Sequence, residues 1–194
     1  MLGSGEALPT QPLPFASMAP FRIRTYGDPV LAVPARPVTA FDDDLRRLAE
    51  DMLATMYEAP GVGLAAPQVG VQKRLFVYDA GDGPHIVVNP TLTVLEGAWE
   101  FEEGCLSVPG LSWPIVRPAS VRLEGFDLDA NPVAVEGDEL LGRVLQHEVD
   151  HLDGRLLLTR LSKGDRRRAL RDLRNRALDE AAPGTGADVG ARGS

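Results

Sequence analysis

The chain has 194 residues, of which 44% are hydrophobic and 25% are charged. This usage is ordinary for a globular domain and excludes a disordered chain, a collagen-like repeat and a disulfide scaffold. The formal charge of −8 argues against a dedicated DNA-binding protein, because phosphate contacts need a basic surface. With a single cysteine, no internal disulfide is expected, and no run approaches the ~20 apolar residues of a membrane span. We expect a cytoplasmic protein with no DNA or membrane partner.

Composition also predicts the domain organisation. Residues 1–20 lack a basic segment, and prolines interrupt their apolar residues, so we expect a disordered leader rather than a secretory signal. Residues 181–194 are small, polar and rich in glycine, which is typical of a disordered tail. The length between them, 21–180, suits one domain that ends in a C-terminal helix, 163–180.

The first predicted helix begins after Asp42 or Asp43, because either side chain can cap an N-terminus. It is expected to stop at Pro60–Gly61. Apolar residues at helical spacing give it one stripe for the core. That stripe consists of Leu45, Leu48, Ala49, Met52, Leu53, Met56 and Tyr57.

Several short strands are predicted next, from β-branched and aromatic runs bounded by turn residues. They are Arg74–Asp79, His85–Asn89, Thr91–Leu95, Ser120–Asp127 and, after a turn at Asp129–Pro132, Val133–Val135. A second helix is expected from Asp138 to Asp153, with Gly154 as its stop signal. A strand-like run, Leu156–Leu161, and a last helix, Asp165–Glu180, complete the order. Consecutive strands joined by turns favour an α+β fold with mostly antiparallel pairing.

The second helix contains H-E-x-x-H, formed by His147, Glu148 and His151. Residues at i and i+4 lie on one helix face, so both imidazoles can reach a single ion. Glu148 is rotated by about a third of a turn and can lie beside that ion, where a carboxylate can take a proton from activated water. Both histidines and the glutamate continue apolar stripes, and burying them is costly unless a cation pairs with them. The alternative is that they are core residues satisfied by other partners.

A third ligand can come from Cys105 or His85, and spacing alone leaves both open. Cys105 lies in Glu-Gly-Cys-Leu-Ser, where Gly104 lets the backbone approach closely. A thiolate with two imidazoles suits a late divalent metal with one open position, which indicates catalysis rather than a structural site. Taken alone, a lone cysteine is more often a small buried hydrophobe.

A glycine-rich segment, GVGLAAPQVG at residues 61–70, follows the first helix. It is neither a P-loop nor a dinucleotide fingerprint. Its Gln68 places an amide donor in a tight loop, and such a donor near a metal can stabilise an oxyanion. The alternative is a loop that merely packs through its small residues.

These three segments, GVGLAAPQVG, EGCLS and QHEVDHL, resemble in order the signature motifs of the peptide deformylase family. The resemblance implies a hydrolase that removes the N-formyl group from the initiator methionine of new bacterial polypeptides and releases formate. It implies that Cys105, His147 and His151 bind the metal and that Glu148 is the general base and acid. It also implies that Gln68 and the backbone N–H of Leu106 form the oxyanion site.

The family resemblance further implies an α+β fold in which the H-E-x-x-H helix packs against antiparallel sheets, with 21–180 as the catalytic domain. The implied metal is Fe²⁺ in the cell, with Zn²⁺, Ni²⁺ or Co²⁺ in isolated proteins. The methionine side chain is expected to contact four residues, and the backbone of one of them, Gly63, is expected to pair with the substrate. These four residues are Val62, Gly63, Leu140 and Val144.

The chain departs from well-known members at Gly110–Ile115, which replaces a more polar and basic stretch at the rim of the substrate site. Trp113 there is either a stacking or lid contact or an ordinary half-buried tryptophan. The basic C-terminal helix suggests ribosome docking, as in some bacterial members, although a solvated helix face explains it equally well. The arginines concerned are Arg166, Arg167, Arg168, Arg171 and Arg174.

Two other functions fit parts of the pattern. A metallopeptidase of the general H-E-x-x-H type takes its third ligand from downstream, but no histidine follows His151. A deformylase-like fold kept as a metal-stabilised binding module without turnover is disfavoured, because Gln68, Cys105 and Glu148 are all intact. We therefore expect a deformylase acting on N-formylmethionyl nascent peptides.

Overall fold

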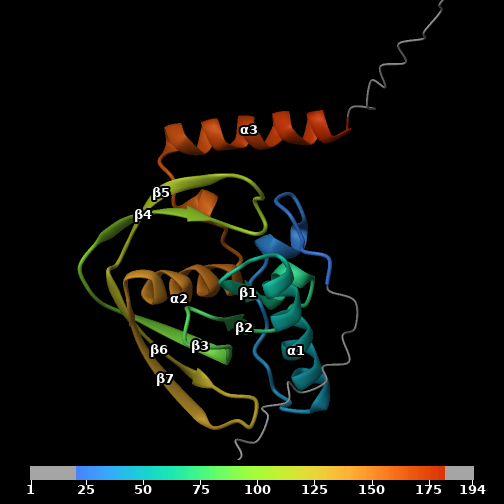
Figure 1. Cartoon of the computed structure of the whole chain (residues 1–194), viewed down its shortest axis with the longest axis vertical. Helices are drawn as coiled ribbons and strands as arrows, with labels where there is room; N and C mark the ends of the chain where they lie inside the picture. The colour runs from blue at the N-terminus through green and yellow to red at the C-terminus, as the bar shows by residue number, and fades with distance from the viewer. Residues whose placement is uncertain (1–20, 182–194) are drawn as a thin grey trace, which may run out of the picture.

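The computed structural model describes residues 21–181 of the chain (Figure 1). The predicted leader, 1–20, lies outside the described residues, and so does the predicted tail from residue 182 onward. The helices are α1 (Asp43–Glu58), α2 (Glu139–Leu152) and α3 (Lys163–Ala181), with short 3-10 helices η1 (Pro29–Ala32), η2 (Ala66–Val69) and η3 (Leu157–Thr159). The strands are β1 (Gly63–Ala65), β2 (Leu75–Tyr78), β3 (His85–Glu96), β4 (Trp99–Gly104), β5 (Ser112–Arg117), β6 (Ser120–Phe126) and β7 (Pro132–Asp138).

Two antiparallel sheets form the β part of the fold. The larger has the strand order β1-β2-β3-β6-β7, which leaves β1 and β7 at its edges. The smaller pairs β4 with β5, from Trp99 opposite Arg117 to Gly104 opposite Ser112. The expected α+β class with antiparallel sheets is confirmed.

Helix α2 lies between the two sheets (Figure 1). Its apolar stripe packs onto the larger sheet, with Leu145 and Leu152 fully buried against Phe76, Val121 and other strand residues. Gly154 follows the helix with φ +71°, a left-handed conformation that glycine adopts without strain. Both predicted ends of α2 agree with the structure to within one residue.

Helix α1 covers a second part of the core, beside β1 and β2. Asp42 caps it by accepting a hydrogen bond from the Leu45 N–H at 2.9 Å. Most of the predicted stripe is buried or partly buried, but Tyr57 is half exposed, because its hydroxyl donates a 2.7 Å hydrogen bond to Asp79 at the surface.

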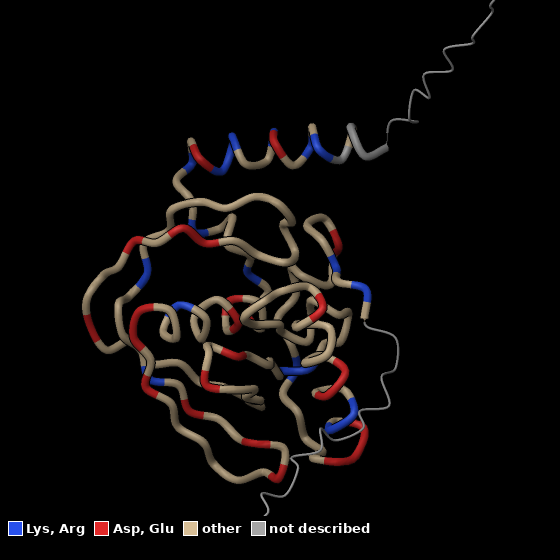
Figure 2. Tube along the Cα trace, in the orientation of Figure 1, with Lys and Arg blue, Asp and Glu red and all other residues tan. Residues whose placement is uncertain are grey.

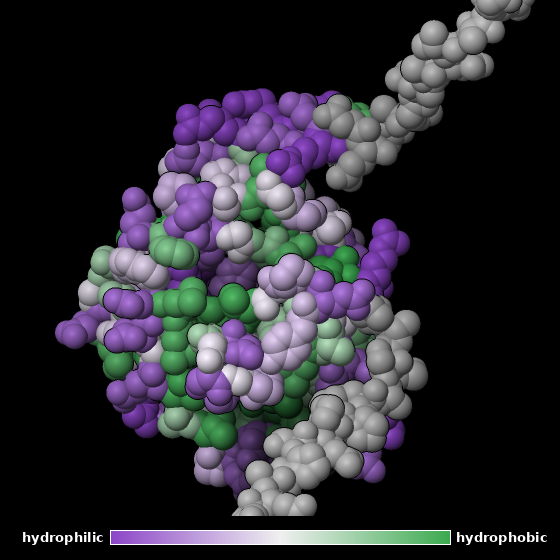
Figure 3. Space-filling view, viewed as in Figure 1, coloured by the Kyte–Doolittle hydropathy of each residue, from purple (hydrophilic) through white to green (hydrophobic). Residues whose placement is uncertain are grey.

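Helix α3 packs over the smaller sheet through one narrow apolar face. Ala169 is buried and Leu173 partly buried against Val108, Ile115 and Leu158. The outer surface of α3 is strongly hydrophilic, with blue basic and red acidic residues alternating along it (Figures 2 and 3). Among residues 21–181, no helix has the length and apolar character that crossing a bilayer requires.

Two of the sequence-based element predictions are wrong, and three strands were not predicted. Leu156–Leu161 contains the 3-10 helix η3 rather than a strand, because its leucines turn into the cluster beneath α3. His85–Asn89 and Thr91–Leu95 are one strand, β3, which continues through a bulge at Asn89 and Pro90. Asn89 has φ +51°, and its side chain forms two hydrogen bonds with the Val38 backbone. The unpredicted strands are β1, which has only three residues, and β4 and β5, whose runs are acidic or contain proline.

The central role of α2 predicts a large cost for shortening Leu145, whose side chain is 0% exposed. We expect Leu145→Ala to lower the free energy of unfolding by about 2–5 kcal/mol, because it leaves a cavity. Leu178→Ala is the matched control, since that side chain is 60% exposed, and a change below about 0.5 kcal/mol is expected. Denaturant unfolding measures both, and similar losses in the two variants would contradict this account.

Candidate metal centre

Three side chains converge beside α2. His147 and His151 lie one turn apart on this helix, and Cys105 follows the end of β4. Their ligand atoms all lie within 4.8 Å of one another. The Nε2 atom of His151 is 3.2 Å from the Cys105 sulfur and 3.1 Å from the Nε2 atom of His147. A thiolate and two imidazoles directed at one point are a donor set that suits a late divalent metal ion.

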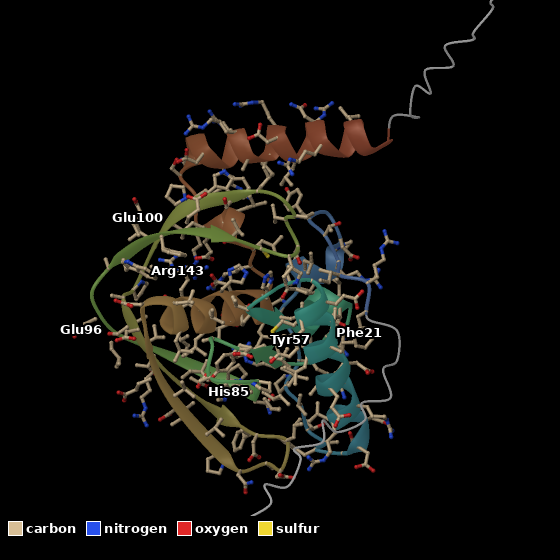
Figure 4. All side chains as sticks on the ribbon, in the orientation of Figure 1. Phe21, Tyr57, His85, Glu96, Glu100 and Arg143 are labelled. Carbon is tan, nitrogen blue, oxygen red and sulfur yellow. The ribbon has the colours of Figure 1, made fainter. Side chains whose placement is uncertain are left out.

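The other candidate ligand, His85, lies elsewhere on β3 (Figure 4). Its ring stacks on Tyr78 with the centroids 4.8 Å apart, and its Nε2 atom is 3.1 Å from Asp82. Its side chain is 41% exposed. The structure thus brings Cys105, and not His85, to the histidine pair.

Glu103 orients His147. Its Oε1 atom accepts a 2.6 Å hydrogen bond from Nδ1 of His147, which turns the Nε2 atom of that ring toward Cys105 and His151. Glu103 is buried and also accepts hydrogen bonds of 2.7–2.8 Å from Arg117 and Arg143. Burial by itself raises the pKa of Glu103, but the hydrogen bonds from Arg117 and His147 outweigh it and hold that pKa well below its usual range.

The buried charges continue behind Glu103. Arg117 also donates a 2.7 Å hydrogen bond to Asp150 on α2, and Asp150 accepts another from Arg160 at 3.0 Å. This network was not predicted from the sequence. The one sequence feature that pointed to it is Glu103, two residues before Cys105. Its partners Arg117, Asp150 and Arg160 form no recognisable motif in the sequence.

Glu148 lies on the neighbouring stripe of α2 and is 3% exposed. Burial raises its pKa to about 7, although the charge of His147 opposes that shift. Its Oε2 atom has no hydrogen-bond partner among the described residues. Gly63 approaches this carboxylate so closely that a Cβ atom at residue 63 would overlap it. The glycine in β1 therefore makes room for the carboxylate.

Gln68 is held by hydrogen bonds at both ends of its amide. Its Oε1 atom accepts from the Ala65 N–H at 2.8 Å, and its Nε2 donates to Ser107 at 3.2 Å. The same nitrogen is 3.9 Å from the Cys105 sulfur. The amide donor of Gln68 therefore points toward Cys105. Leu106, whose backbone N–H is the second expected donor, directly follows Cys105 in the chain.

A cavity of about 560 Å³ opens beside this cluster. The four residues expected to contact the methionine side chain all line it, as do Gln68, Cys105 and Leu106. Those four are Val62, Gly63, Leu140 and Val144. Trp113 is not among the lining residues, because its side chain packs in the apolar cluster beneath α3. The expectation of an ordinary half-buried tryptophan fits its position.

Known proteins are similar to this chain in sequence and in fold. A sequence profile described as polypeptide deformylase matches residues 20–167. A peptide deformylase of Acidothermus cellulolyticus is 50% identical over 157 residues, covering 81% of this chain and 87% of that protein. One from Clostridium botulinum is 47% identical over 146 residues, covering 75% and 99%.

Solved structures of peptide deformylases also resemble the fold of this chain. The crystal structure of a peptide deformylase from Legionella pneumophila matches with a TM-score of 0.79 and 41% identity, covering 85% of this chain and all of that chain. Sequence and fold thus agree across the part of the chain that carries the metal cluster, Gln68 and Glu148. The chain belongs to the polypeptide deformylase family, whose members are metal-dependent enzymes that remove the N-formyl group from nascent peptides.

Proposed function

We propose that the chain performs this deformylation with Glu148 as general base and acid, beside one divalent metal ion held by Cys105, His147 and His151. The observation that carries the proposal is the convergence of one sulfur and two imidazole nitrogens beside a buried carboxylate, one oxygen of which has no hydrogen-bond partner within residues 21–181. The residues 21–180 are proposed to act as one catalytic domain. We place the enzyme in the cytoplasm, where formylated chains are made.

The proposed metal is Fe²⁺ in the cell, with Zn²⁺, Ni²⁺ or Co²⁺ able to occupy the same ligands in the isolated protein. One thiolate and two imidazoles support this choice, because these ligands prefer late transition metals over Mg²⁺ or Ca²⁺. When bound, such an ion supplies Lewis-acid activation of water and of the formyl carbonyl.

Glu148 moves the proton. Its free Oε2 atom accepts a proton as water adds to the formyl carbon, and the same oxygen then passes that proton to the departing amine. The C–N bond breaks, and formate and a free amino terminus result. Because burial raises the pKa of Glu148 to about 7, its carboxylate can hold that proton between the two steps.

Gln68 and the N–H of Leu106 are proposed to stabilise the oxygen of the formyl carbonyl as negative charge develops on it. The two hydrogen bonds that fix the Gln68 amide support this role, because a preorganised donor needs no rearrangement during the reaction.

The methionine side chain is proposed to lie in the cavity against Val62, Leu140 and Val144. The backbone of Gly63 is proposed to pair with the substrate as an added strand. The position of β1 at the edge of the larger sheet supports this, since an edge strand has unpaired N–H and C=O groups. Pairing through the backbone tolerates varied residues after the methionine.

The arginines of α3 are proposed to contact ribosomal RNA phosphates. Arg167, Arg171 and Arg174 are exposed and share one outer face, at helical spacing i, i+4 and i+7, opposite Ala169 and Leu173. Arg166 and Arg168 flank this face, and Arg168 pairs with Asp165. The outer arginines lie on the side that the apolar contacts of α3 leave free.

The role of Glu148 predicts the effect of Glu148→Gln, which keeps the shape of the side chain but cannot take the proton. We expect kcat for formate release from formyl-Met-Ala-Ser to fall by about 10²–10⁴-fold, while the bound metal per chain stays unchanged. Metal analysis of the same samples is the control. Unchanged turnover would remove Glu148 from the reaction, and cleavage of internal peptide bonds by the parent chain would favour the peptidase.

The role of Glu103 predicts weaker metal binding in Glu103→Gln. The neutral amide orients His147 less well and leaves Arg143 without a carboxylate partner, so we expect the metal dissociation constant to rise about 10–100-fold. Titration with a competing chelator measures it. Glu100→Gln on the exposed side of β4 is the matched control and should bind metal like the parent chain. Equal affinity in both variants would contradict the orienting role.

Ribosome docking predicts the effect of reversing three charges, Arg167→Glu, Arg171→Glu and Arg174→Glu. The triple variant should lose co-sedimentation with ribosomes at low salt, because phosphate contacts are electrostatic. Its kcat/KM on formyl-Met-Ala-Ser should stay within about twofold of the parent value, since α3 keeps its apolar contacts. Unchanged co-sedimentation would leave these arginines as a solvated surface.

A further inference from the structure

Arg160 lies away from the cavity beside the metal cluster. It follows η3 in the orange segment that connects α2 with α3 (Figure 1). Its side chain is 42% exposed and lines a second cavity, of about 430 Å³. The residues of α2 that line this second cavity are Gln146, Val149, Asp150 and Asp153, and none of them lines the first. Arg160 is therefore not placed to contact a substrate bound beside the metal cluster.

Two arginines hold the buried carboxylate of Asp150. Nε of Arg160 donates to Oδ2 of Asp150 at 3.0 Å, and Nη2 of Arg160 donates to Oδ1, so the guanidinium contacts the carboxylate at two points. Nη1 of Arg117 donates to the same Oδ2 atom at 2.7 Å. Asp150 is only 4% exposed. Without Arg160, Arg117 would be the one cation within residues 21–181 that pairs with this buried charge.

Arg117 joins Asp150 to Glu103. Its Nε and Nη2 atoms donate to Glu103 at 2.8 and 2.7 Å. Glu103 in turn accepts the hydrogen bond from Nδ1 of His147. Each of the three inner side chains is at most 5% exposed, so water and salt screen the ion pairs between them only weakly. A continuous row of charged side chains thus leads from Arg160, at the second cavity, to the imidazole of His147.

We propose that Arg160 is a positioning residue for the metal centre and that it acts through Asp150. Without Arg160, the buried charge of Asp150 attracts Arg117 more strongly, so the hydrogen bonds from Arg117 to Glu103 lengthen. Glu103 then orients the ring of His147 less well. The inference rests on the proposed binding of a metal ion by the cluster that contains His147.

Arg160→Gln tests this role in the full chain, by titration of bound Zn²⁺ with a competing chelator. Replacing a direct partner of a metal-bound histidine costs about 10–100-fold in affinity, and Arg160 is a more distant partner, so we expect the dissociation constant to rise about 3–10-fold. The absorption bands of the Co²⁺-loaded chain should shift too, because they depend on ligand geometry. A loss of overall stability alone leaves both readouts unchanged as long as the chain is folded.

Arg155→Gln is the matched control. Arg155 lines the same second cavity and loses the same charge, but its ion pair is with Asp153, at 4.0 Å, and not with Asp150. Its Zn²⁺ dissociation constant should stay within about twofold of the parent value. Equal dissociation constants for Arg155→Gln and Arg160→Gln overturn the proposal.

If Arg160→Gln does not fold, Arg160→Lys and Arg155→Lys replace the two variants. Lysine keeps the charge but contacts a carboxylate as a single point, so Arg160→Lys should still weaken Zn²⁺ binding relative to Arg155→Lys. Equal affinities in this pair likewise overturn the proposal.

A double variant tests the route through Glu103. When Glu103→Gln is already present, adding Arg160→Gln should raise the Zn²⁺ dissociation constant by less than about twofold more, because the two residues act in one row. If the full effect of Arg160→Gln persists in that background, Arg160 acts independently of Glu103 and the proposal is overturned.

Cys105→Ser separates this inference from the metal binding on which it rests. Much weaker Zn²⁺ binding in this variant supports the proposed ligands, because a hydroxyl is a poor substitute for a thiolate. If Cys105→Ser binds Zn²⁺ like the parent chain, the proposed ligand set is wrong and the inference falls with it. If Cys105→Ser loses Zn²⁺ but Arg160→Gln keeps the parent affinity, only the inference falls.

Discussion

A carboxylate shielded from water, that of Glu103, joins parts of the chain that are far apart in sequence. It lies on β4, and its partners are Arg117 at the end of β5 and both Arg143 and His147 on α2. Moving such charges out of water costs several kcal/mol per ion, and only close, well-directed partners offset that cost. The network is therefore stable in one arrangement, which fixes the small sheet relative to the central helix.

The same arrangement aligns the two halves of the metal cluster. Cys105 lies two residues beyond Glu103, at the end of the strand that the carboxylate anchors. His147 is oriented by that carboxylate directly. One buried anion thus sets the position of the sulfur and the direction of an imidazole. Cys105 follows β4 and His147 lies on α2. Their ligand atoms come close together because Glu103 connects these two elements.

Much of the architecture could be predicted from local patterns. Helical periodicity marked α1 and α2 nearly to their ends, and the spacing of His147 and His151 placed both imidazoles on one face. Patterns failed where structure depends on distant partners. Trp99–Gly104 is too acidic to suggest a strand, and the leucines of η3 form an apolar run that fits a strand or a buried turn equally well. Only the fold could decide whether Cys105 or His85 is the third candidate metal ligand. The spacing of residues in the sequence does not tell which segment lies next to α2 in three dimensions.

Helix α3 forms part of the surroundings of the cavity mouth. Its Ala169 packs against Val108, and Arg176 donates a hydrogen bond to the carbonyl of Pro109, a residue on the cavity rim. An α-helix with its side chains is about 10 Å across. A large particle resting on the outer face of α3 would thus stand roughly one helix diameter from the rim. About three extended residues span that distance, so a peptide held at the outer face of α3 would reach the cavity rim with a very short segment.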